Sequence, residues 1–188
     1  MKQSLGSGFW PKYQGLSFPK MSVRVMKERF SDLTFPFAGI TLVLCWLLFI
    51  LFFHAPVSQV LFVLGNVTVA IGVLLILLAM KNLRKRGGPE EIKDFTSTTE
   101  IVKQGIYSIV RHPLYLGWFL TYPAAMMVSQ HWLIVGLGVI GMASMIQITR
   151  NADTQLVAKF GPEYENYMEE VPRLNIILGI AWKLKRWV

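Results

Sequence analysis

Four polar and aromatic side chains precede a long apolar run. Tyr107, Arg111, His112 and Tyr115 lie within one nine-residue segment, and Pro113 follows the histidine. Proline suits the first turn of a helix, where backbone N–H groups lack partners and the helix dipole is positive. Such a helix start could receive a carboxylate beside these side chains. The same composition also fits a helix that only enters a membrane with snorkelling side chains.

A second polar segment, residues 151–173, follows the next apolar run. Gly161-Pro162 predicts the end of one long helix over 131–160, and Pro172 predicts the end of a shorter one. The shorter helix carries acidic and phenolic groups: Glu163, Tyr164, Tyr167, Glu169 and Glu170.

Long charge-free stretches predict the elements that position these segments. Hydrophobic residues make up 53% of the 188-residue chain and charged residues only 16%, below the usual quarter of soluble domains. Residues 33–80 and 112–149 contain no Asp, Glu, Lys or Arg. Each stretch divides at a polar turn, which predicts four spans of roughly 16–24 residues. The expected spans are 36–53, 57–80, 113–128 and 131–148.

The basic residues predict the orientation of these spans. All 19 Lys and Arg residues fall in segments 2–29, 81–111 and 150–186. With four spans these segments share one side, which the positive-inside rule assigns to the cytosol. The net charge of +8 then faces anionic lipid, and no nucleic-acid partner is expected.

We therefore expect an all-α, integral membrane helical bundle that forms one domain over residues 1–188. It comprises an interfacial leader (1–35), four spans (36–149) and a cytosolic helical tail (150–188). Because the third and fourth spans form a hairpin, their polar ends must meet at the cytosolic surface. The two polar segments should therefore converge where lipid meets water.

Several other features do not indicate a nucleotide-binding, disulfide or metal site. GLGVIG, residues 136–141, matches a nucleotide-binding pattern, but it lies inside a charge-free span with no strand before it. Its glycines fit close helix packing in lipid instead. The single Cys45 excludes an internal disulfide and a cysteine metal site. His54 and His131 lie at the uncharged turns, and no metal site is expected.

Both polar segments resemble one family. G-x-Y-x-x-V-R-H-P-L-Y-x-G, from Gly105 to Gly117, resembles the signature of the isoprenylcysteine carboxyl methyltransferase and phospholipid methyltransferase superfamily of integral membrane enzymes. L-x-x-x-F-G-x-E-Y-x-x-Y-x-x-x-V-P-R, from Leu156 to Arg173, resembles the second block of that family. Together the similarity covers about residues 95–175.

The resemblance implies a small helical membrane protein that binds S-adenosylmethionine between the cytosolic ends of its last spans, without a Rossmann sheet. The residues that it connects with the cofactor lie mainly in the first block: Gln104, Tyr107, His112, Pro113, Leu114 and Tyr115, with Trp118 or Tyr122 as further positions.

The chain departs from the family pattern at one place. A Glu-Glu pair usually precedes the second block, and a carboxylate there holds the amino-acid end of the cofactor. Here those positions are Ala152 and Asp153. We expect Asp153 to serve with a shorter reach; otherwise the cofactor is held differently or not at all.

The expected activity is transfer of a methyl group from S-adenosylmethionine to a lipophilic acceptor that enters from the membrane lipid, prenylcysteine-like or phospholipid-like. Arg150 or Arg173 would orient an acidic acceptor, and Glu163 or His112 would accept a proton from an amine. Two alternatives remain open. One is a membrane reductase of the sterol-reductase type that uses NADPH, and the other is a non-catalytic membrane protein that keeps the fold.

Overall fold

The computed structural model describes residues 34–52, 58–86 and 100–185, and every regular element in these ranges is helical. Most of the expected leader, residues 1–33, and His54 lie outside the described ranges. The elements in chain order are α2 (Thr34–Phe52), α3 (Gln59–Arg86), the short 3-10 helix η1 (Gly105–Ser108), α4 (Pro113–Ser129), α5 (Trp132–Phe160), α6 (Pro162–Glu170) and α7 (Ile176–Lys185).

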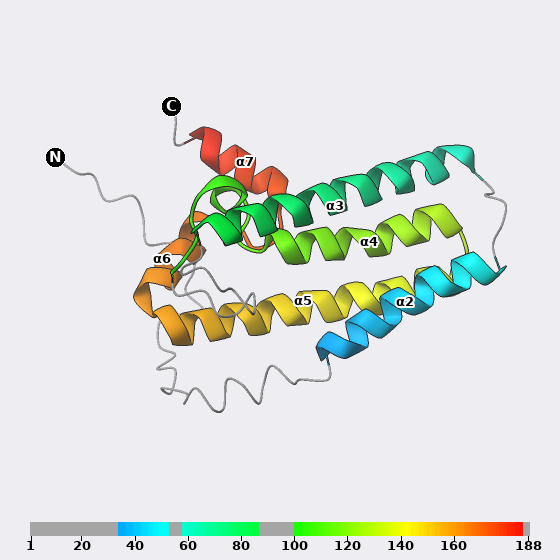
Figure 1. Ribbon diagram of the computed structural model, residues 1–188, viewed down its shortest axis with the longest axis horizontal. Coiled ribbons are helices and arrows are strands. Elements are labelled where there is room, and N and C mark those ends of the chain that lie inside the picture. Colours follow the sequence, from blue (N-terminus) through cyan, green and yellow to red (C-terminus); the bar gives the residue numbers. More distant parts are fainter. Residues whose placement is uncertain (1–33, 53–57, 87–99, 186–188) are drawn as a thin grey trace.

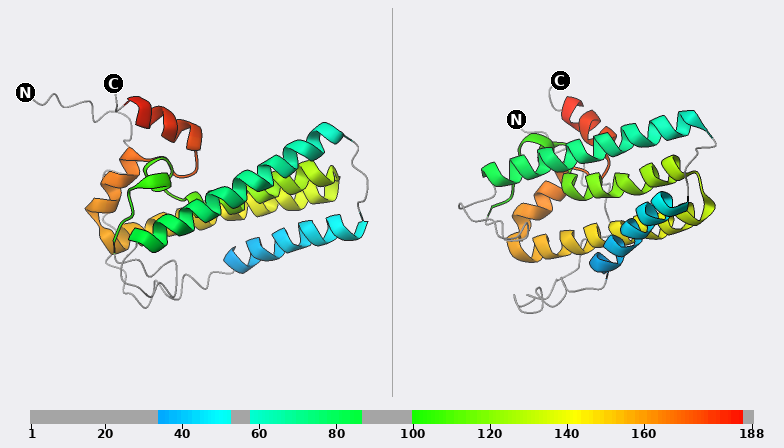
Figure 2. Two further views of the ribbon diagram at one scale, coloured as in Figure 1. Left: turned by 45° about the horizontal axis from the view of Figure 1, so that its top comes forward. Right: turned by 45° about the vertical axis from the view of Figure 1, so that its right-hand side comes forward.

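Helices α2 to α5 run side by side as an elongated bundle, and η1, α6 and α7 gather at one end of it (Figure 1). Within the bundle α3 packs mainly on α4 and α2 mainly on α5, while α4 also contacts α5 and α2. The further views in Figure 2 show the same grouping. The core is correspondingly split into small apolar clusters, one of which joins Leu75, Val110 and Leu116 at the end near η1.

Proline and glycine set the helix boundaries as the sequence predicts. Pro113 occupies the first turn of α4. Helix α5 ends at Phe160, and Gly161 has a φ of 60°, a left-handed backbone that glycine adopts without strain. Pro162 then starts α6. Gly105, with a φ of 65°, likewise begins η1.

Two of the helices, α3 over Gln59–Lys85 and α5, are long and apolar enough to cross a membrane. Only 17% of the most apolar window of α3 and 33% of that of α5 is buried. A core helix of a soluble protein would be mostly buried, so these exposed apolar surfaces fit a lipid environment. Helix α2 has a shorter apolar part, Pro36–Leu51, and α4 has 17 residues.

A side chain links the two turns at the end of the bundle opposite η1. The Gln130 amide accepts a hydrogen bond from Ser58 N (2.6 Å) and donates one to Ser58 O (2.7 Å). Ser58 directly precedes α3, and Gln130 ends α4 with a left-handed φ of 52°. This pairing satisfies backbone groups at one helix end and fixes the α3 start beside the α4 end.

Helices α3 and α4 approach closely at two glycines. A Cβ atom on Gly117 would lie 2.5 Å from Ile76 Cγ1 and 2.7 Å from Gly72 O. The GLGVIG segment of α5 serves helix packing only in part. Gly138 and Gly141 are buried against α4, whereas Gly136 is exposed with nothing within 4 Å of its Cβ position.

We predict that Gly117→Ala lowers the free energy of unfolding by about 1–3 kcal/mol, because the added methyl overpacks the α3–α4 contact. The control Gly136→Ala should leave it unchanged or raise it by up to about 1 kcal/mol, because alanine favours the helix and meets open space. Both can be measured by denaturant unfolding in detergent micelles. Equal stability of the two variants would refute the close contact.

Candidate functional site

Backbone hydrogen bonds join the two polar segments at the end of the bundle. The N–H of Arg111 donates to Pro172 O (3.0 Å), and the N–H of His112 donates to Arg173 O (3.2 Å). Helix α7 adds a third link, because Lys183 Nζ donates to Ser108 Oγ (2.8 Å). The convergence predicted from the sequence is therefore confirmed.

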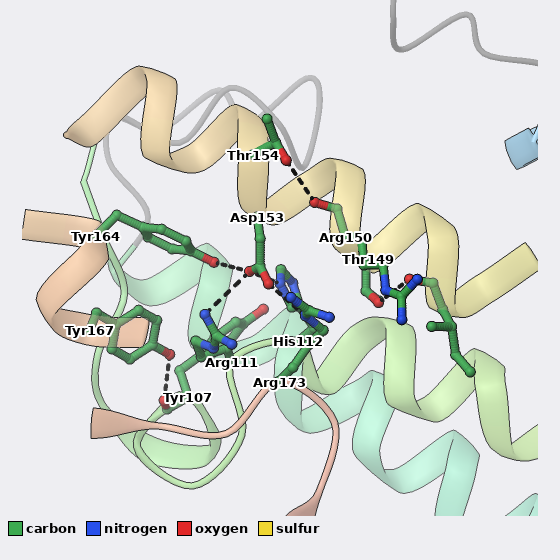
Figure 3. Close-up of polar contacts among 11 residues, drawn as sticks. Tyr107, Arg111, His112, Thr149, Arg150, Asp153, Thr154, Tyr164, Tyr167 and Arg173 are labelled. Carbon is green, nitrogen blue, oxygen red and sulfur yellow. Dashed lines mark hydrogen bonds and ion pairs between the residues drawn. The ribbon is translucent and has the colours of Figure 1, made fainter. Parts of the chain in front are cut away.

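Asp153, on the last turns of α5, is the centre of the polar contacts at this end (Figure 3). Its Oδ1 accepts hydrogen bonds from His112 Nε2 (2.7 Å) and Tyr164 Oη (2.9 Å). Its Oδ2 accepts one from Arg173 Nε (2.6 Å). Arg111 Nη1 lies 3.5 Å from Oδ1 and forms an ion pair without a hydrogen bond.

The centre of this cluster is buried from water. The side chains of Asp153 and Arg111 are 4% and 7% exposed. A buried guanidinium without a counter-charge costs several kcal/mol, and a buried carboxylate costs a similar amount. Asp153 and its basic neighbours therefore depend on one another, and each fixes the others' position.

Two tyrosines of α6 complete the wall around the cluster. Tyr164 donates to Asp153, and Tyr167 Oη donates to Tyr107 O (2.6 Å). Burial raises the pKa of Tyr164, and the negative charge of Asp153 raises it further. Burial raises the pKa of Tyr167 and Tyr107 as well. All three phenols therefore stay neutral, and Tyr164 and Tyr167 remain hydrogen-bond donors at any physiological pH.

A pocket opens beside the cluster, between the end of α3, the η1 segment, the start of α4, the end of α5 and α6. Its lining combines rings and aliphatic groups with a few polar side chains. The lining residues are Leu83, Glu100, Ile101, Val102, Tyr107, Arg111, His112, Leu114, Tyr115, Ala152, Gln155, Leu156, Lys159, Phe160, Tyr164 and Tyr167.

Two lining residues carry buried polar atoms without a hydrogen-bond partner. These atoms are Nε and Nη1 of Arg111 and Oε1 of Gln155. Buried polar groups are nearly always paired, and an unpaired one commonly marks a functional position. The pocket wall thus contains unused donors and an unused acceptor, all closed to solvent in this structure.

The structure brings four of the predicted cofactor-binding residues to the pocket: Tyr107, His112, Leu114 and Tyr115. The imidazole of His112 and the ring of Tyr115 lie with their centroids 5.6 Å apart. Pro113 is buried at the start of α4 and is not part of the lining. Asp153 lies directly behind the wall, with its carboxylate bound to protein groups.

The other predicted positions lie outside the lining. Gln104 is exposed, and so is Arg150. Glu163 is exposed and pairs with Lys103 at 2.8 Å, while Arg173 is bonded to Asp153. Of the two further positions, Trp118 is 45% exposed and Tyr122 is buried in the bundle, where its hydroxyl donates to Ala38 O (2.6 Å).

Sequence reasoning named Arg111 in the first polar segment but gave it no role of its own, and it missed Gln155. A helical signal could have found Gln155, because residues 152, 155, 156 and 159 follow the i, i+3, i+4, i+7 spacing of one helix face, and all four line the pocket. Among the described residues, no group of three or more His, Cys, Asp or Glu side chains could hold a metal ion.

Comparison with known proteins identifies the family. The family model described as "Phospholipid methyltransferase" matches residues 60–161. Methanethiol S-methyltransferase of Crocosphaera subtropica is 38% identical over 74 residues, which are 39% of this chain and 28% of that protein. Protein-S-isoprenylcysteine O-methyltransferase of Dictyostelium discoideum is 31% identical over 72 residues, 38% of this chain and 30% of that protein.

The chain thus covers less than a third of the length of either relative. No solved structure matches it. The family match nevertheless spans more than half of the 188 residues and includes η1, α4, α5 and most of the pocket lining. The resemblance inferred from the two sequence blocks is therefore confirmed, and the chain belongs to the phospholipid methyltransferase family.

Proposed function

We propose that the protein is an integral membrane enzyme that transfers a methyl group from S-adenosylmethionine to a lipophilic acceptor at the cytosolic membrane face. One observation carries the proposal. The two blocks that resemble the methyltransferase signature meet around a single pocket at the polar end of an apolar bundle, and that pocket carries buried, unpaired polar atoms. Family membership supports a methyltransferase.

The pocket residues fit the proposed donor. Rings of Tyr107, Tyr115, Phe160, Tyr164 and Tyr167 line the pocket, and aromatic faces attract organic cations such as a sulfonium. When bound, S-adenosylmethionine supplies an electrophilic methyl group on a positively charged sulfur.

The contribution of the chain is alignment and exclusion of water. His112 and Tyr115 shape the wall of the pocket, and the ion pairs of Asp153 hold Arg111 and His112 in place. The direct contact between Asp153 and the amino-acid end of the donor stays a prediction. Its bonds to the protein support a positioning role, in which it acts through Arg111 and His112.

The acceptor needs residues that orient it and, if it is an amine, a residue that takes its proton. We propose that Arg150, exposed on α5, or Arg173 orients an acidic acceptor. If the acceptor is an amine, Glu163 or His112 takes its proton. For Glu163 the exposed ion pair with Lys103 must open first, and for His112 the hydrogen bond to Asp153 holds the imidazole in place.

We further propose that α2 to α5 each cross the membrane, with the pocket end in the cytosol. In this arrangement the pocket receives the water-soluble donor from the cytosol and the acceptor from the bilayer. Leu83 on α3 and Leu114 on α4 line the pocket next to the apolar bundle, which supports access from lipid.

Four crossings with a cytosolic pocket predict opposite labelling at the two ends. In a Cys45→Ala background, Trp132→Cys at the start of α5 should react with a membrane-impermeant maleimide in intact cells. Glu165→Cys in α6 should react only after permeabilisation. Both positions are exposed, so access depends on the side of the membrane. Labelling of both from the same side would contradict the arrangement.

Methyl transfer is tested with tritiated S-adenosylmethionine on membranes from cells that produce the chain. Label should appear in the organic extract. His112→Ala should lower the incorporation at least ~10-fold, because it removes a pocket ring and a donor to Asp153. The matched control His131→Ala, at the opposite end of the bundle, should retain it.

Thermal unfolding in detergent of each variant separates loss of the site from loss of the fold. The proposed function fails if the membranes transfer no label and instead oxidise NADPH. It also fails if the purified protein binds neither S-adenosylmethionine nor NADPH, as expected of a non-catalytic member with this fold.

A further inference from the structure

The buried oxygen of Gln155 is the feature of the pocket that the proposed function leaves unexplained. Gln155 Oε1 is inaccessible to solvent and has no hydrogen-bond partner, although the residue lines the pocket. An amide oxygen that loses water without gaining a donor destabilises the fold. A ligand that donates a hydrogen bond there would remove this cost.

Neighbours on the same helix face supply no competing acceptor. Ala152, Leu156 and Lys159 line the pocket beside Gln155, and two of these side chains are apolar while the third is a cation. Asp153 is one residue removed from this face, and its oxygens are bound by His112, Tyr164 and Arg173. On α5, Gln155 therefore carries the acceptor for a ligand in the pocket, which reaches the oxygen when the amide turns toward it.

Arg111 provides the complementary group. Its Nε and Nη1 are buried without hydrogen bonds, and the residue lines the same pocket. The ion pair with Asp153 offsets its charge but leaves these donors unused. A free donor on a guanidinium matches a carboxylate, and a free neutral acceptor matches an ammonium. Arg111 and Gln155 together match an α-amino acid, in which a carboxylate and an ammonium group are attached to the same carbon.

We propose that Gln155 accepts a hydrogen bond from the ammonium of the donor's amino-acid portion while Arg111 donates to its carboxylate, which makes Gln155 a specificity-determining residue. The inference rests on the proposed function, because it takes the donor to be S-adenosylmethionine. It assigns recognition of the amino-acid end to a neutral amide, at the place where Ala152 provides no polar group.

Glu100 is the competing candidate for the ammonium. Its carboxylate lines the pocket as well, but the residue is exposed. Water already satisfies an exposed carboxylate, and solvent screens its charge. Removal of its charge should therefore affect affinity less than removal of the buried Gln155 acceptor.

Two ligands isolate the amino-acid end. S-adenosylhomocysteine carries it, and 5′-methylthioadenosine lacks it but keeps the nucleoside and the thioether. Their dissociation constants are measured by calorimetry on the full chain in detergent. Gln155→Leu should weaken S-adenosylhomocysteine about 10-fold, as expected for one hydrogen bond to a charged group. The affinity for 5′-methylthioadenosine should change less than about 2-fold.

Two further variants define the role. Gln155→Glu keeps an acceptor at this position and should bind S-adenosylhomocysteine at least as tightly as the original chain. Glu100→Gln should change the ratio of the two affinities less than about 3-fold. The inference is overturned if Gln155→Leu lowers the affinity for both ligands equally or for neither. It is also overturned if Glu100→Gln, and not Gln155→Leu, lowers the affinity for S-adenosylhomocysteine relative to that for 5′-methylthioadenosine.

Failure of the proposed function looks different in the same experiment. If the unsubstituted chain binds neither ligand, the donor assignment fails, and the role of Gln155 fails with it. If the unsubstituted chain binds both ligands and Gln155→Leu does not discriminate between them, only the role of Gln155 fails.

Discussion

The arrangement of the polar end depends on the buried charge of Asp153. Its carboxylate lies against Arg111, His112 and Arg173, which come from two segments far apart in sequence. Without it, the buried guanidinium of Arg111 would lack a counter-charge and the loop before α4 would gain by opening to water. The same carboxylate fixes the rotation of α5, so that residues 152, 155, 156 and 159 face the pocket.

The apolar bundle and its polar end have different structural roles. Helices α3 and α5 expose apolar side chains along most of their length, and close glycine contacts hold α3 against α4. The polar side chains with defined partners concentrate around Asp153, where backbone bonds from Arg111 and His112 anchor the segment after α6. A rigid helical frame therefore presents a site built from helix ends and the segment before α4, which suits the proposed polar donor and apolar acceptor.

Local chemistry explains which features could be predicted from the sequence. Pro113, Gly161 and Pro162 mark helix boundaries because their backbone restrictions act within a residue or two. The hairpin of α4 and α5 forces its two polar ends together, so the convergence near His112 followed from connectivity. The four expected spans correspond to four helices, although within the described ranges only α3 and α5 meet the length and apolarity of a span by themselves.

Contacts across the fold could not be predicted. Arg111 fitted either a polar site or a helix entry with snorkelling side chains, and only the approach of Asp153 explains its burial. Gln155 carries no sequence signal stronger than its place on a helix face. Glu163 matched the second block, yet its side chain points to Lys103 on the surface. For Arg111 and Glu163 the partner lies more than 15 residues away, where side-chain type alone does not determine which groups meet.

A double-mutant cycle between Asp153 and Arg173 tests the central role of the carboxylate most directly. The free energy of unfolding would be measured in detergent for Asp153→Asn, Arg173→Gln and the combined variant. Because the pair is close and partly buried, we expect a coupling energy of at least about 1.5 kcal/mol. Effects that add within about 0.5 kcal/mol would contradict it.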